Sequence, residues 1–380
     1  MAEADNKKIE KEEINQGLEG VVVAETSLCC VDGAKGKLVY SGYLLDDLIE
    51  RGHNYEDIAF LLLQGHLPSE QESQDFSAKL KEKRQLSQQV QDFVDAIPTG
   101  LDYMEALRTA VSVLSVEVNT DYPATVDQAM DVIAKAPILL SRYYRRNTGQ
   151  EILESDPELS QAANYLYLLT GQDCHSEAGK AYARGLDTYF ISAIEHGMNA
   201  STFTARVTTS TESDLVSAIV AAISTLKGPL HGGAPSEVIH MLDEIGSKEN
   251  AEPWMRKVLD AGGRLMGFGH RVYKSYDPRA KALQEAVAEM PSDNERLELS
   301  RYVEQTAIRL LAEYKPGRNL YPNVEFGAAA VLRSVGLPAE LFPATFGIAR
   351  TAGWSAHIIE QAQHNRLIRP STRYTGKLPE

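Results

Sequence analysis

The sequence predicts a mostly α-helical protein of two domains with a short β segment near its N-terminus. Three observations carry this prediction. The chain has 380 residues, more than one small hydrophobic core usually serves. Apolar residues recur at helical spacing along most of it, and only residues 20–43 have the pattern of a β-hairpin. No Pro/Ser-rich linker divides the chain, so we expect it to cross between two domains more than once.

The β segment comes first, and helices follow it. Residues 20–43 contain the apolar runs VVVAETSLCCV and KLVYSGY around a glycine-containing turn, which predicts two short strands or a hairpin. Residues 44–51 and 55–64 read as helices that end at Gly52 and Gly65, because glycine is favoured just beyond a helix C-terminus.

Further helices are predicted along the rest of the chain. Apolar side chains form one stripe in 104–116 and again in 161–170. Asp214 is a good N-cap for a helix over 215–226. Residues 342–363 are apolar on all sides, so we expect much of that helix to be buried.

The charge is acidic and unevenly distributed. The chain has 38 basic and 53 acidic side chains, and its net charge is −15. Residues 1–226 carry a net charge of −17, whereas residues 227–380 carry +2. Nucleic acids and anionic membranes bind basic faces, so we expect neither as a partner. A small anion held by a few local arginines stays compatible, and residues 227–380 are the part in which to expect it.

Cysteine content and the N-terminal residues predict a cytoplasmic protein. The three cysteines, two of them adjacent, form no C-x-x-C pair, which speaks against a disulfide framework or a thiolate zinc site. The first residues lack the features of a signal or transit peptide. The longest mostly apolar run, 215–226, is too short to span a bilayer. We find no metal motif, phosphate loop, nucleophile elbow or dinucleotide fingerprint, so no metal is expected.

His231 is the first candidate functional residue. It lies in the loop sequence KGPLHGGAPS, after a helix that ends at Gly228 and before one that Pro235 suits as a first-turn residue. Gly232 and Gly233 let a backbone or a ligand approach closely. The alternative is a glycine-rich turn that happens to contain a polar residue.

A second candidate cluster is MGFGHRVYKSYDPRA, which contains His270. Asp277 and Pro278 are a good N-cap and first residue of a helix, so Arg279 falls in its first turn. A cation there opposes the helix dipole. Either Arg279 points to solvent, or an anion lies between His270 and Arg279 at the helix start.

The third cluster is YPNVEFGAA. Glu325 opens a helix that we expect to end at Gly336. A glutamate in a first helical turn is ordinarily a surface residue that complements the helix dipole, and local sequence alone favours that interpretation.

Taken together, these clusters resemble the citrate synthase family, in its shorter, dimeric type. The resemblance covers nearly the whole chain, and six motifs occur in the family's order and approximate spacing. The motifs are EHGMNAST (195–202), GPLHGGA (228–234), MGFGHRVYKSYDPRA (266–280), PNVEF (322–326), ARTAGW (349–354) and IRP (368–370).

The resemblance implies a nearly all-helical protomer with a large domain, a small domain and a cleft between them. The large domain would comprise residues 1–231 and 331–380, and the small domain residues 232–330. This insertion agrees with the missing linker. His231 would then lie near a domain boundary, where closure on a substrate is felt.

The chemistry that the family implies is the condensation of acetyl-CoA with oxaloacetate. By resemblance, Glu325 removes a methyl proton of acetyl-CoA while His231, as a neutral imidazole, hydrogen-bonds the thioester oxygen. The resulting enol(ate) attacks the ketone of oxaloacetate, and His270 supports the charge on the ketone oxygen. Citryl-CoA is then hydrolysed to citrate and CoA.

The resemblance also implies how both substrates are held. Arg279, Arg350, His196 and His270 would bind oxaloacetate from one subunit, with Arg369 donated by the partner of a homodimer, since guanidinium groups bind carboxylates in a bidentate manner. Residues near the CoA phosphates would be Arg264, Lys274, Lys315 and Arg318. The CoA thioester is a substrate, and no cofactor is expected.

The sequence departs from the best-known family members at Glu325, where they have aspartate followed by an aromatic–Ser–Gly stretch. Glutamate adds one methylene, about 1.5 Å of reach, and a misplacement of about 1 Å can cost roughly a hundredfold in rate. Two other functions stay open, the first because the sequence hardly separates the two thioester substrates and the second because of this departure. One is a 2-methylcitrate synthase that uses propionyl-CoA, and the other is a catalytically weak protein kept as a binding or assembly module.

Overall fold

The computed structural model describes residues 14–232, 234–269, 277–291, 294–318 and 320–377. This part of the chain is mostly helical, and the predicted fold class is confirmed. Three short strands form one antiparallel sheet in the order β1 (Cys29–Asp32), β2 (Lys37–Tyr40) and β3 (Tyr43–Leu44). The predicted hairpin is therefore present. Its first apolar run becomes a strand only at Cys29, and residues 19–28 belong to no strand.

Several of the helices before His231 pack around α17 (Phe342–Gln363). In chain order, the helices before His231 are α2 (Leu45–Glu50), α3 (Tyr55–Gln64), α4 (Glu70–Glu82), α5 (Gln88–Ala96), α6 (Tyr103–Val113), α7 (Val126–Asn147), α8 (Gln161–Thr170), α9 (Glu177–Ala193), α10 (Ala200–Ser210) and α11 (Leu215–Leu226).

The helices after His231 complete the fold. They are α12 (Ala234–Ile245), α13 (Lys248–Asp260), α14 (Pro278–Glu289), α15 (Asn294–Tyr314), α16 (Val324–Ser334) and α17 (Phe342–Gln363). Single turns of 3₁₀ helix occur at Gln16–Leu18, Leu114–Val116 and Ala339–Leu341.

Local capping explains where many of these helices begin. Asp214 accepts a hydrogen bond from the Ser217 amide at 2.9 Å and starts α11, as predicted. Asn54 and Asp57 form a reciprocal capping box at the start of α3. Gly65, with φ of +82°, ends that helix in the left-handed conformation that glycine adopts without strain.

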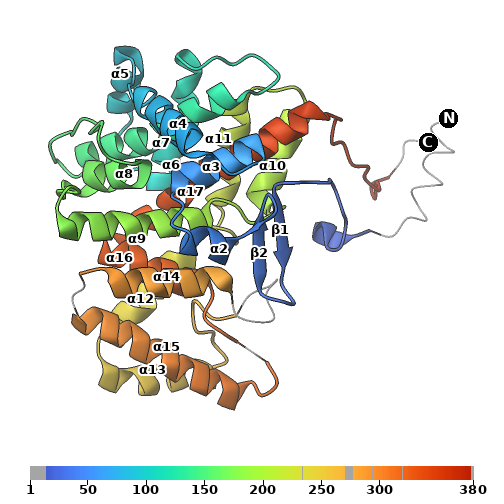
Figure 1. The fold of residues 1–380 in the computed structure, drawn as a ribbon. Helices are drawn as coiled ribbons and strands as arrows, with labels where there is room; N and C mark the ends of the chain where they lie inside the picture. Colours follow the sequence, from blue (N-terminus) through green and yellow to red (C-terminus); the bar gives the residue numbers. More distant parts are fainter. Residues whose placement is uncertain (1–13, 233, 270–276, 292–293, 319, 378–380) are drawn as a thin grey trace.

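Helix α17 runs through the core, which confirms the prediction from its all-round apolar pattern. It contacts α3, α6, α7, α9, α10 and α11, and Trp354 in its middle is fully buried. Figure 1 shows α17 behind the helices of the N-terminal half. Polar side chains on α17 are therefore held in place on all sides.

Helices α12 to α16 form a second group, drawn in yellow and orange in the lower part of Figure 1. Within it α13 packs on α15, and α12 and α14 pack on α16. Helices α14 and α16 also contact α9, so the group lies directly against the rest of the molecule. The domain boundaries at 231/232 and 330/331 stay a prediction, and residue 330 lies inside α16.

Both terminal segments leave the helical body on the same side (Figure 1). At the C-terminus, the described residues after α17 form no helix or strand. No helix in the described ranges is long and apolar enough to cross a bilayer.

Candidate functional site

A cavity of about 1030 Å³ brings together five residues that the sequence singled out. Three come from loops or helix starts: His196 precedes α10, His231 lies between α11 and α12, and Arg279 is in the first turn of α14. Glu325 lies at the start of α16, and Arg350 comes from the buried middle of α17. The cavity therefore gathers two imidazoles, two guanidinium groups and a carboxyl group.

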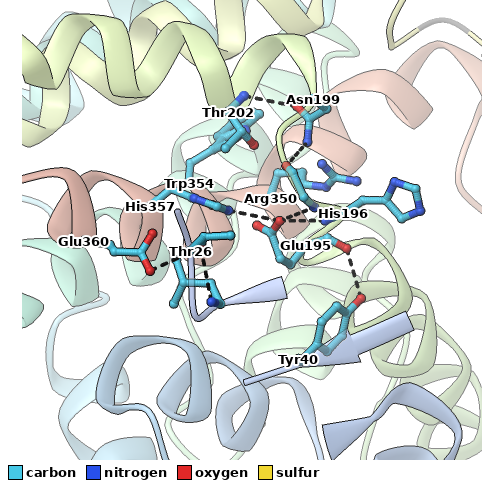
Figure 2. A network of polar contacts seen from close by, with 12 residues as sticks. Thr26, Tyr40, Glu195, His196, Asn199, Thr202, Arg350, Trp354, His357 and Glu360 are labelled. Atoms are coloured by element: carbon cyan, nitrogen blue, oxygen red, sulfur yellow. Dashed lines mark hydrogen bonds and ion pairs between the residues drawn. The ribbon is translucent and has the colours of Figure 1, made fainter. Parts of the chain in front are cut away.

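The segment that carries His196 is fixed from several sides. The Tyr40 hydroxyl donates to the carbonyl oxygens of Ile191 and Glu195, at 3.2 and 3.1 Å. The Glu195 carboxylate accepts hydrogen bonds from the amides of His196 and Gly197, at 2.9 and 2.6 Å (Figure 2). These contacts set the position of the His196 backbone at the cavity wall.

Ser201 connects His231 to the core. Its hydroxyl oxygen lies 2.9 Å from His231 Nε2 and 2.7 Å from Asn199 Oδ1, and it accepts from Trp354 Nε1–H at 3.1 Å. Asn199 caps α10, so its Oδ1 accepts the Thr202 amide and cannot donate. The one Ser201 proton thus goes either to Asn199 or to His231 Nε2, and its direction sets the imidazole tautomer. When Ser201 donates to Nε2, the ring proton is on Nδ1.

The His231 imidazole is neutral at physiological pH. Burial, followed by the positive charge of Arg350, lowers its pKa to about 4. A neutral ring can donate a hydrogen bond from one nitrogen while its other nitrogen accepts one. It can therefore polarise a carbonyl group without carrying a positive charge itself.

Ser201→Ala is expected to slow catalysis by about tenfold, because one neutral hydrogen bond that orients His231 is lost. Steady-state kcat measures this. Ser355→Ala is the matched control, since Ser355 is also buried on α17 beside Trp354 and its hydroxyl has no hydrogen-bond partner. Equal activity of Ser201→Ala and the wild type would show that Ser201 does not orient the ring.

Glu325 is held at the helix start by Asn323. The Asn323 side chain accepts the Glu325 amide at 2.9 Å and donates to the Gly269 carbonyl at 2.9 Å, which also connects α16 to the preceding loop. Burial raises the pKa of Glu325 above its ordinary value. Gly327, two residues further along α16, packs closely on α14, because a Cβ there would lie 2.9 Å from Leu283 Cβ. A part-buried carboxyl with a raised pKa is suited to act as a general base.

Arg279 is buried, which overturns the alternative that it points to solvent. Only 3 % of the residue is exposed, and Asp277, which caps α14, also forms an ion pair with it at 2.8 Å. The same carboxylate therefore starts the helix and orients the guanidinium toward the cavity that Arg279 lines.

Arg350 is the most informative side chain of the site. It is 3 % exposed, its Nε donates to the Ala193 carbonyl, and its guanidinium lies 4.8 Å from the Phe346 ring centroid. Its buried Nη1 has no hydrogen-bond partner, and no carboxylate of the described residues lies within 4.0 Å. Because a buried unpaired cation is costly, this donor calls for an anionic ligand.

The structure does not place every predicted residue at the cavity. His270 and Lys274 lie outside the described residues. Arg264 and Arg318 are exposed, Lys315 is half-buried, and none of the three lines the cavity. Arg369 is exposed on the segment that follows α17 and does not line the cavity of its own chain. Among the described residues, no group of three or more His, Cys, Asp or Glu side chains could hold a metal ion.

Sequence reasoning missed three parts of the site. Ser201 and Glu195 lie in the same motif as His196, but nothing local in the sequence predicts that they contact His231 or the loop amides. Residues 17–24, here called the N-terminal strap, also line the cavity. The valines of the strap, 21–23, are exposed and belong to no strand, although the apolar run predicts one there.

The fold and the cavity define a helical enzyme that acts by acid–base chemistry on a carboxylate-bearing substrate. The chain belongs to the citrate synthase family, since the family model "Citrate synthase, C-terminal domain" matches residues 17–371. The citrate synthase of Haloferax volcanii is 40 % identical over 377 residues, covering 96 % of both chains. The 2-methylcitrate synthase 1 of Corynebacterium glutamicum is 34 % identical and also covers 96 % of both.

A solved structure shares the fold. The citrate synthase of Thermoplasma acidophilum, in a ternary complex with carboxymethyl coenzyme A and oxaloacetate, is 32 % identical and superposes with a TM-score of 0.87, covering 97 % of this chain and 98 % of the other. The predicted membership of the family is confirmed.

Proposed function

We propose that this chain condenses acetyl-CoA with oxaloacetate to give citrate and CoA, through an enol(ate) and citryl-CoA. The observation that carries the proposal is the buried, unpartnered Nη1 of Arg350 in the cavity that also holds Glu325 and His231. An anion-binding guanidinium beside a carboxyl with a raised pKa and a neutral imidazole fits a carboxylate substrate that reacts with a weak carbon acid.

The first step is removal of a proton from the methyl group of acetyl-CoA. Glu325 accepts this proton. His231 donates from Nδ1 to the thioester oxygen, in the tautomer that forms when the Ser201 proton turns from Asn199 Oδ1 to His231 Nε2. Negative charge that develops on the thioester oxygen is thereby stabilised where it forms.

The second step is attack of the enol(ate) on the ketone carbon of oxaloacetate. Arg279 and Arg350 hold its carboxylates, and His196 adds a hydrogen bond, so that the ketone is oriented before the carbon–carbon bond forms. His270 is proposed, from the family motif, to support charge on the ketone oxygen. Hydrolysis of citryl-CoA then releases citrate and free thiol, and the reaction uses no cofactor.

We also propose that the active unit is a homodimer in which Arg369 completes the oxaloacetate site of the partner subunit. Arg369 is exposed and does not line the cavity of its own chain, which supports this arrangement. For CoA, Arg264, Lys274, Lys315 and Arg318 remain the proposed phosphate contacts. From the sequence features we propose that the protein is cytoplasmic, and from the reaction that it acts in the tricarboxylic acid cycle.

Hybrid dimers test the shared site. Arg369→Gln alone should raise the oxaloacetate KM by about tenfold or more, because a carboxylate contact is lost. A dimer of one Arg369→Gln and one Glu325→Gln subunit should recover a site with near wild-type KM, since one of its two sites has both residues intact. Arg366→Gln, an exposed arginine on the same segment, is the control. Hybrids without recovery would contradict donation across the interface.

A second function is favoured by one observation. Relatives at 34 % identity include 2-methylcitrate synthases, and one methylene is worth only about 1–3 kcal/mol in an apolar pocket. The experiment for the proposed function is therefore a thiol-release assay with oxaloacetate and either acetyl-CoA or propionyl-CoA. Thiol release that needs both substrates supports condensation, and its absence contradicts it.

A further inference from the structure

A row of polar and charged side chains runs behind the cavity, from the His196 loop to the N-terminal strap. Its members are Glu195, His357, Arg206 and Glu360. Glu195, His357 and Arg206 are each at most 2 % exposed, and none of the four lines the cavity. Figure 2 shows Glu195 between His357 and the His196 backbone, with Glu360 beyond His357.

The hydrogen bonds along this row have a defined direction. Arg206 donates from Nε and Nη2 to His357 Nδ1, at 3.0 and 2.7 Å. Because an arginine is always a donor, His357 Nδ1 must carry a lone pair, and the ring proton is on Nε2. That nitrogen lies 3.1 Å from Glu195 Oε1. The imidazole therefore places its Nε2–H beside the Glu195 carboxylate, in a close polar contact whose angle lies outside that of a hydrogen bond.

Glu195 lies beside the backbone that holds two of the proposed oxaloacetate ligands, His196 and Arg350. Its Oε1 accepts the amides of His196 and Gly197, while Arg350 donates to the carbonyl of Ala193, two residues before Glu195. The close approach of α17 is possible because residue 353 is glycine: a Cβ there would lie 2.7 Å from Glu195 Oε2 and 2.1 Å from the Ile194 carbonyl oxygen. Movement of this carboxylate would move the loop that holds His196 and meets Arg350.

The other end of the row holds the strap. Arg206 Nη2 also donates to Glu360 Oε2. Glu360 Oε1 accepts from the Ser27 amide at 2.9 Å and from the hydroxyls of Thr26 and Ser27, both at 3.2 Å. Thr26 and Ser27 lie two and three residues after the end of the strap that lines the cavity.

We propose that Glu195 is a positioning residue for oxaloacetate and that His357 and Arg206 hold its carboxylate in place. The proposal rests on the proposed function, because His196 and Arg350 are taken as the oxaloacetate ligands. Glu195 acts through the hydrogen bonds it accepts, and its own carboxylate does not contact the substrate. Loss of its acceptor atoms therefore weakens oxaloacetate binding while leaving the acetyl-CoA site in place.

Two pairs of variants separate positioning from charge and from general stability. Glu195→Ala removes the acceptor, whereas Glu195→Gln keeps an acceptor oxygen at the same reach and removes only the charge. His357→Gln keeps an N–H at the place of Nε2, whereas His357→Asn keeps only the acceptor at the place of Nδ1. Glu56→Ala is the control, since Glu56 is a buried glutamate that accepts one backbone amide and lies outside the cavity.

The readouts are the oxaloacetate Kd by calorimetry, the KM of each substrate and the melting temperature. We expect Glu195→Ala and His357→Asn to raise the oxaloacetate Kd about tenfold or more, with Glu195→Gln and His357→Gln within about threefold of the wild type. The acetyl-CoA KM should change by less than about twofold. Glu56→Ala should lose stability and keep its oxaloacetate Kd.

Two results overturn the inference. One is an unchanged oxaloacetate Kd in His357→Asn and in Glu195→Ala, and the His357 pair decides alone if Glu195→Ala does not fold. The other is equal weakening by both members of each pair, because the row would then act through charge or overall stability. If the wild type and all the variants bind oxaloacetate equally well, only the positioning role is refuted. If the wild type does not bind oxaloacetate, the proposed function itself is refuted.

Discussion

Glu325→Gln is expected to lower kcat for citrate formation by about 10³–10⁴-fold, because the amide cannot accept the methyl proton of acetyl-CoA. Burial raises the pKa of the Glu325 carboxyl, so the wild-type group is a stronger base than an exposed glutamate. The substitution keeps the size of the side chain, and its effect on folding should be small.

The matched control for this variant is Glu304→Gln. Burial also raises the pKa of Glu304, which is half-buried on α15 and bonded to Gln284 rather than exposed to the cavity. Its activity should stay near that of the wild type. If Glu325→Gln instead kept the full activity of the wild type, Glu325 would not be the base. The chain would then be the catalytically weak binding or assembly module, the alternative raised by glutamate in place of the family's aspartate.

Arg350→Gln is expected to raise the oxaloacetate KM by roughly a hundredfold or more, since truncating one partner of a buried charge pair costs about 2–5 kcal/mol. The acetyl-CoA KM should move far less, because Arg350 is proposed to contact only the carboxylate of oxaloacetate. Steady-state kinetics with each substrate varied in turn checks the split.

Arg145→Gln serves as the control for loss of a buried guanidinium. Arg145 is 8 % exposed, and its Nη1 donates to the carbonyls of Leu168 and Leu169 at the end of α8, away from the cavity. This variant should lose stability and keep the oxaloacetate KM. Equal changes in both substrate KM values for Arg350→Gln would contradict its role as a carboxylate ligand.

Local signals in the sequence predicted the elements well. Asp214 starts α11 and Asp277 starts α14 as expected, because an N-cap acts on amides only two or three residues away. The all-round apolar pattern of 342–363 likewise predicted a buried helix. Such signals also placed His231 in its loop between two helices.

Contacts between distant residues could not be predicted in this way. Ser201 lies 30 residues from His231 and 153 from Trp354, yet all three meet at one hydroxyl. From the sequence, Arg279 could either point to solvent or bind an anion. Only the folded chain shows that Arg279 is buried and forms an ion pair with Asp277. The unpartnered Nη1 of Arg350 is a property of packing around α17, for which no local pattern exists.

The most direct test of the account is the release of free thiol by the purified chain. The measurement compares kcat/KM for acetyl-CoA and propionyl-CoA at saturating oxaloacetate, with citrate or 2-methylcitrate identified as the product. The account predicts thiol release only when both substrates are present, with acetyl-CoA preferred and one citrate formed per thiol. Thiol release that does not depend on oxaloacetate, or none with either thioester, would contradict it.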